Sequence, residues 1–117
     1  MITITVATAQ AAKIGNDLHR ACQSLRTHLT EAAAATAKQV ENMEKGFTVE
    51  MRWVTGPAQR AAADQIKVQL LVDTALMLGL TQDDVQAAYT HTDGMLWFVT
   101  AEEQAEREAR RAARVAK

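Results

Sequence analysis

The sequence predicts an α+β fold, with a small, three-stranded, largely antiparallel sheet covered by helices in the order β-α-β-α-α-β-α. Residues 2–6 and 47–54 alternate apolar and polar side chains with the period of a strand. Residues 95–99 are wholly apolar, as in a strand that is covered on both faces. We expect one domain over residues 1–100 and a C-terminal helical arm of the same domain over residues 101–117.

The first helix is predicted to be unusually long. Thr8 can cap it, and apolar side chains recur at steps of three and four through residues 9–45. Residues 17–45 alone would extend ~44 Å as a helix, which exceeds the diameter of a domain of this size. We therefore expect the helix to overhang the core or to pack on a second copy. Gly15 and Asn16 lie inside the run and are candidates for a break.

The middle of the chain is predicted to form a strand and then the central buried helix. Gly46 ends the first helix, and residues 47–54 form the second strand. Pro57 begins a helix that runs to about Leu78, because proline is favoured in the first turn. Apolar side chains occupy nearly every direction of this helix from Ile66 onward, which indicates burial on all sides.

The last elements are marked by two capping threonines. Thr81 can cap a short helix over residues 82–90, in which Asp84 lies in the favourable first turn. A turn over residues 91–94 leads to the third strand. Thr100 and Glu103 resemble a capping box, which opens the last helix.

Residues 71–90 resemble the helix-turn-helix of bacterial and phage DNA-binding proteins. Ala75 would let the two helices approach, Gly79 would take a left-handed conformation in the turn, and Val85 would fill the crossing. The strands predicted on either side extend the resemblance to winged-helix domains. The resemblance implies a groove-facing surface of six residues. These are Thr81, Gln82, Asp83, Gln86, Ala87 and Thr90.

The charges disagree with this resemblance. The net charge is +2 over residues 1–67, −6 over residues 68–103, which lack Lys and Arg, and +3 over residues 104–117. Phosphate contacts supply most of the affinity for DNA and need cations or helix N-termini. Nucleic acid is therefore a disfavoured partner, and the exposed face with Asp83, Asp84 and Gln86 is predicted to bind a protein.

The C-terminal helix is predicted to be a docking arm with two faces. Alanines at steps of three and four allow another helix to approach closely, and arginines gather on another side for an acidic surface. The alternative is a solvated helix whose last cations complement its dipole. The helix-packing set is Ala105, Ala109, Ala112 and Ala116. The basic partner-binding set is Arg107, Arg110, Arg111 and Arg114.

The sequence predicts no catalytic, cofactor-binding or metal-binding residues. His19 and Cys22 are neighbours on a helix, but two ligands do not make a zinc site. Asp73 lies on an apolar stripe, so it either reaches a partner or marks an open groove; a small-molecule pocket near Asp73 and Trp97 stays a minor alternative. One cysteine and the absence of a 20-residue apolar run suit a cytoplasmic protein without a membrane span.

We therefore expect a non-enzymatic regulatory protein, phage or bacterial in type, that acts through protein–protein contacts and forms a homodimer. A phage or mobile-element modulator of a host protein is one such function. The alternative is a winged-helix-like, DNA-binding transcription regulator.

Overall fold

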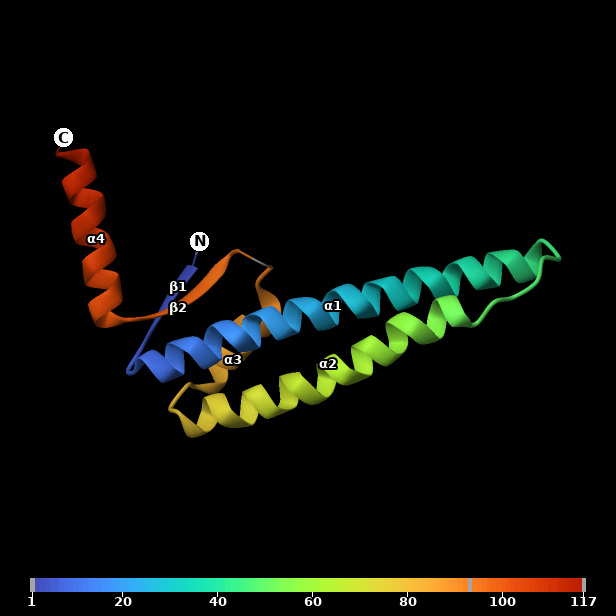
Figure 1. Ribbon diagram of the computed structural model, residues 1–117, viewed down its shortest axis with the longest axis horizontal. Helices are drawn as coiled ribbons and strands as arrows, with labels where there is room; N and C mark the ends of the chain where they lie inside the picture. Colours follow the sequence, from blue (N-terminus) through green and yellow to red (C-terminus); the bar gives the residue numbers. More distant parts are fainter. Residues whose placement is uncertain (1, 93, 117) are drawn as a thin grey trace.

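The computed structural model describes residues 2–92 and 94–116. Its elements are β1 (Ile2–Val6), α1 (Ala9–Glu44), α2 (Arg52–Met77), α3 (Gln82–Thr90), β2 (Leu96–Thr100) and α4 (Ala101–Val115). The molecule is long and thin, with extents of 66 × 38 × 18 Å. Its long axis is the hairpin of α1 and α2, and α4 projects from the opposite end (Figure 1).

The predicted long helix is confirmed, and it is the central element of the fold. The hydroxyl of Thr8 caps α1 by accepting from the backbone N–H of Ala11 at 3.1 Å. The first half of α1 contacts α2, α3 and β2, whereas its second half contacts α2. The helix overhangs the core, as expected, and α2 covers one side of the overhang.

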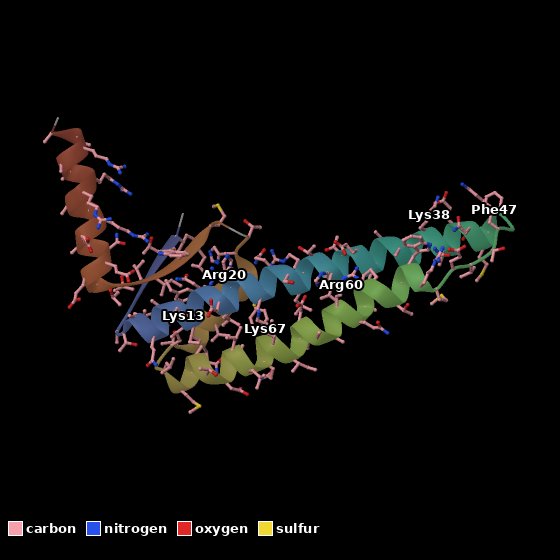
Figure 2. The ribbon with its side chains drawn as sticks, viewed as in Figure 1. Lys13, Arg20, Lys38, Phe47, Arg60 and Lys67 are labelled. Atoms are coloured by element: carbon pink, nitrogen blue, oxygen red, sulfur yellow. The ribbon has the colours of Figure 1, made fainter. Side chains whose placement is uncertain are left out.

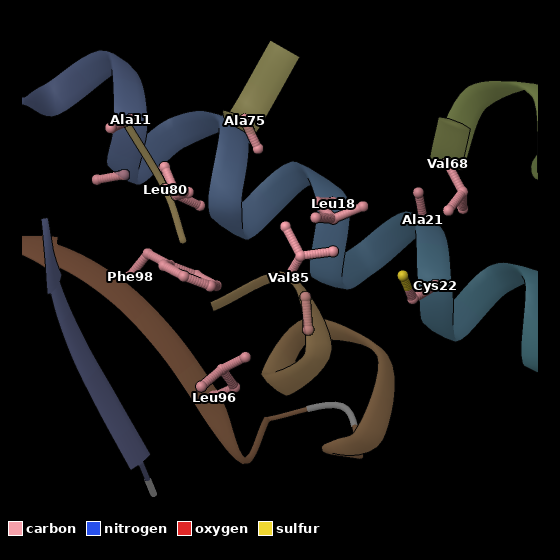
Figure 3. Packing of buried hydrophobic residues seen from close by; sticks show 12 residues of the cluster. Ala11, Leu18, Ala21, Cys22, Val68, Ala75, Leu80, Val85, Leu96 and Phe98 are labelled. Atoms are coloured by element: carbon pink, nitrogen blue, oxygen red, sulfur yellow. The ribbon is translucent and has the colours of Figure 1, made fainter. Parts of the chain in front are cut away.

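The hydrophobic core lies at the end of the hairpin that is remote from its tip (Figure 3). Phe98, Leu18 and Val68 are almost completely buried there. Small side chains of α1 surround them and let the other elements approach closely. The remaining buried members of the core cluster are Ala11, Ala12, Ala21, Cys22, Ala75, Leu80, Val85, Ala88 and Leu96.

Gly15 and Asn16 do not break α1; they attach β2 to it. A Cβ atom on Gly15 would lie 2.5 Å from Cγ of Phe98, so only glycine lets this ring reach the helix. The Asn16 side chain donates to the carbonyl of Phe98 at 3.0 Å and accepts from its N–H at 2.8 Å. Buried backbone groups need such partners, and this amide supplies them at a point where a third strand is lacking.

The prediction of a three-stranded, largely antiparallel sheet is wrong. The described residues form one sheet of two parallel strands, in which Ile2 is level with Leu96 and Val6 with Thr100. The strands are parallel because α1, α2 and α3 all lie between them in the chain and carry it back to the same end. The element order is β-α-α-α-β-α.

The strand predicted at residues 47–54 is absent, because these residues form the hairpin tip and the first turn of α2. The N–H of Thr55 already bonds the carbonyl of Met51 at 2.8 Å, and α2 begins at Arg52 rather than at Pro57. The tip lies far from β1 and β2 (Figure 1), so this segment has no strand to pair with. Alternation alone does not satisfy the hydrogen bonds of a strand.

The predicted burial of α2 on all sides is also wrong. Its buried residues are Ala61, Val68 and Ala75, which recur every seven residues on the side toward α1. Ile66, Leu70 and the remaining outward side chains face solvent. Although apolar side chains point in nearly every direction from α2, only the face toward α1 is covered.

The tight corner between α2 and α3 has the expected geometry. Gly79 has φ +98°, in the region that favours glycine, and Ala75 and Val85 are buried beside the turn. Thr81 and Asp84 form a reciprocal capping box at the start of α3. The strand that would precede the corner in a winged helix is not present among the described residues.

We predict opposite effects for two glycine-to-alanine changes within helices. Gly15→Ala should lower the free energy of unfolding by about 1–2 kcal/mol, because overpacking against Phe98 outweighs the gain in helix propensity. Gly56→Ala is the matched control: its Cβ would meet only Arg60 at an ordinary 3.6 Å, so it should raise stability by about 0.5–1 kcal/mol. Urea unfolding measures both, and equal shifts would contradict the close approach of Phe98.

Candidate functional site

The C-terminal helix α4 is an arm with no buried residue. It begins directly after β2, where the hydroxyl of Thr100 accepts from the N–H of Glu103 at 3.2 Å. Its contacts with the rest of the chain are with β1 and β2, at its base, and the helix then points away from the hairpin (Figure 1). The packing and basic sets predicted on this helix are all solvent-exposed.

The two predicted faces of α4 have different neighbours. No described element covers Ala105, Ala109, Ala112 or Ala116. On the basic side, the guanidinium of Arg107 lies 5.6 Å from the centre of the Trp97 ring on β2, within the range of a cation–π contact. Arg110 forms an ion pair with Glu106, one turn before it on the same helix.

The four basic residues line an open hollow of about 260 Å³. They are Arg107, Arg110, Arg111 and Arg114. Next to this hollow, the indole nitrogen of Trp97 is buried and has no hydrogen-bond partner among the described residues. The arm therefore presents concentrated positive charge above a half-buried aromatic ring.

The acidic partner-binding residues lie on α3, apart from the arm. Asp83 and Gln86 are exposed, but the carboxylate of Asp84 accepts from the N–H of Thr81 at 2.9 Å and so closes the capping box. Within the described part of the chain, no ion pair joins these acids to the arginines of α4. The acidic and basic sets are thus two separate surfaces.

The outer face of α2 is a candidate surface that the sequence reasoning missed. The side chains of Ile66, Leu70 and Met77 are 66%, 63% and 86% exposed. Asp73 lies on the same face, where it accepts from Gln69 at 3.1 Å. The stripe is therefore an exposed face, and Asp73 on it reaches an N–H partner, which is the first of the two alternatives predicted for this residue. Trp97 lies under α4, so it does not share a pocket with Asp73.

More apolar side chains are exposed at the hairpin tip. Phe47 marks this tip (Figure 2), and Met43, Met51 and Trp53 are exposed beside it. The Trp53 indole donates to Glu50 at 3.0 Å, and Arg52 lies 5.1 Å from the centre of its ring. Exposed apolar groups of this size commonly mark contact surfaces.

A polar cluster that the sequence did not indicate joins α1 to α2. Both Nδ1 of His28 and the hydroxyl of Ser24 donate to the same oxygen of Asp64, at 2.5 Å and 2.9 Å. A serine nucleophile would need its hydroxyl on the histidine, so this arrangement is not a catalytic triad. The bond from His28 holds the pKa of Asp64 below its ordinary value. The cluster is a hydrogen-bonded clamp between the helices, beside a hollow of about 410 Å³.

The two residues considered for metal binding are parts of the core. Nδ1 of His19 lies 3.1 Å from the carbonyl of Ala88, and the Cys22 side chain is buried. Burial raises the pKa of the Cys22 thiol to about 11. Among the described residues, no group of three or more His, Cys, Asp or Glu side chains could hold a metal ion.

Comparison with known proteins adds no family to this description. The chain matches no protein-family model, and no curated protein or solved structure is significantly similar to it. No helix in the described part of the chain is both long and apolar enough to cross a membrane.

The clamp predicts a specific acid dependence of stability. Because the pKa of Asp64 is lower in the folded chain than the ~3.9 of a free aspartate, its contribution is present above about pH 4 and is lost as the pH falls through the lower, folded value. Asp64→Asn should therefore be less stable than wild type at pH 7, and the difference should shrink toward pH 3. Urea unfolding at a series of pH values measures this difference.

The control is Asp73→Asn, which removes a carboxylate on the solvent face of α2 and should leave the acid limb of the profile unchanged. A constant difference between wild type and Asp64→Asn from pH 7 to pH 3 would contradict the clamp.

Proposed function

We propose that this chain is a regulatory binding protein that acts through contact with another protein. The observation that carries the proposal is α4, a 15-residue helix with no buried residue. Isolated helices of about 12–15 residues are marginal in water, so most helical stability in proteins comes from packing. A partner that covers the alanine face of α4 would supply that packing.

The composition of the arm supports a protein with an acidic, helical surface as the partner. Alanines let a second helix approach closely, while Arg111 and Arg114 on the other side can form bidentate bonds to carboxylates. The exposed apolar side chains at the hairpin tip offer a second point of contact. Blocking or modulating a host protein, as phage and mobile-element products do, remains the function class that we favour.

A photocrosslinker at Ala109 tests this proposal. In a lysate of the producing cell, we expect it to capture a discrete protein, and Ala112→Glu should abolish capture because it sets a charge in the packed face. The captured protein, made recombinantly, should bind the whole chain in calorimetry and lose at least tenfold in affinity with Ala112→Glu. A crosslinker at Lys13, which is exposed near the start of α1, is the control. Capture that is identical from both positions would contradict the proposal.

DNA binding is the second candidate function, and one observation favours it. Arg107, Arg111 and Arg114 have no carboxylate partner within the described residues, so their charge is available for phosphates. The corner at Gly79 supports it further, whereas Asp83 and Asp84 on α3 oppose it.

We predict that any DNA binding is salt-sensitive and depends on α4. If the chain binds DNA, a fluorescent random-sequence duplex should bind at low ionic strength, and the affinity should fall steeply with added salt because counterions are released. Arg110→Ala combined with Arg111→Ala should weaken binding at least tenfold. The control, Arg20→Ala together with Arg60→Ala, removes two cations from the hairpin. No change in fluorescence anisotropy with the wild-type chain would eliminate this function.

A further inference from the structure

The exposed face of α2 carries a heptad repeat. Its members follow at steps of four and three and are all solvent-exposed. They are Gln59, Ala63, Ile66, Leu70, Asp73 and Met77. Such a spacing forms a continuous seam along a helix, the pattern by which two helices pack side by side. The opposite side of α2 already packs on α1 through Ala61, Val68 and Ala75.

We infer that this seam binds a second copy of the chain, with the two α2 helices antiparallel and related by a two-fold axis near Val68. The inference goes beyond the proposed function, because the proposed partner binds α4, whereas the second copy binds the outer face of α2. In this register Ile66 of each copy meets Leu70 of the other. Gln59 meets Met77, and Asp73 comes level with the small side chain of Ala63.

Charge favours this arrangement over a parallel one. Residues 52–67 contain Arg52, Arg60 and Lys67 against Asp64, a net +2. The rest of α2, residues 69–77, contains Asp73 without any Lys or Arg, a net −1. A two-fold axis at residue 68 sets the basic half of each copy against the acidic half of the other, twice. A parallel pair would set like charges together, which is unfavourable.

The area of the seam limits the affinity of the dimer. From residue 59 to residue 77 it is ~27 Å long, on a helix ~10–12 Å across. Half the surface of such a cylinder is roughly 450–500 Å² per copy, so the helices alone would bury about 900–1,000 Å². That area is at the lower limit of a specific interface. We therefore expect a weak dimer that forms reversibly at micromolar concentration.

The first test is sedimentation equilibrium of the whole chain over a range of concentrations. The wild-type chain should dimerise, more strongly at low salt because the charged halves attract. Leu70→Glu should weaken the dimer at least tenfold, and it should still fold because Leu70 is exposed. The matched control is Val115→Glu, on the arm, where the side chain is 82% exposed and the dimer should persist. A wild-type monomer at hundreds of micromolar, or a dimer that Leu70→Glu leaves intact, would overturn the inference.

The second test measures the orientation of the two copies. A nitroxide label on Gln59→Cys should give a distance of about 30 Å between copies in the antiparallel pair, and about 10 Å in a parallel pair. The native Cys22 does not interfere, because its thiol is buried and its pKa is raised to about 11. A short distance would overturn the register. If the chain does not dimerise but the photocrosslinker at Ala109 still captures its protein, this inference alone is refuted and the proposed function stands.

Discussion

The contact of Phe98 with Gly15 and Asn16 is the constraint on which the fold depends. Two short parallel strands have little hydrogen bonding of their own, and β1 is mostly exposed. The sheet is fixed because the ring of Phe98 fills the space where Gly15 lacks a side chain, and because the amide of Asn16 pairs with both backbone groups of Phe98. This attachment holds β2 on α1, and the base of α4 follows directly from the end of β2.

The hydrophobic core around Phe98 contributes little to the stability of the rest of the hairpin. Beyond Leu25, the hairpin is held by small side chains, by the clamp of His28 and Asp64, and by surface ion pairs such as Arg60 with Glu31. Surface pairs of this kind contribute little to stability. A long hairpin with a thin interface leaves its outer face and its tip exposed, and these are the surfaces available for other molecules.

Local signals in the sequence predicted the helices and their caps well, and failed where pairing depends on distant residues. The caps at Thr8, Thr81 and Thr100, and the left-handed turn at Gly79, depend on neighbours within a few residues. The alternation in residues 47–54 is equally local, but a strand needs a neighbouring strand, and the hairpin places none beside it. For the site, the exposure of the arm could be predicted from its lack of large apolar residues, whereas the open face of α2 could not.

The sequence by itself determined the ends of the helices other than the start of α2, the two faces of the arm and the separation of acidic from basic segments, because these follow from side-chain chemistry and spacing along the chain. Only the tertiary structure decided which face of α2 is covered, that β1 and β2 are parallel, and that Gly15 is a contact point rather than a break. Each of these depends on residues tens of positions apart in the chain. Helical periodicity identifies an apolar face, but only packing decides whether that face meets α1 or solvent.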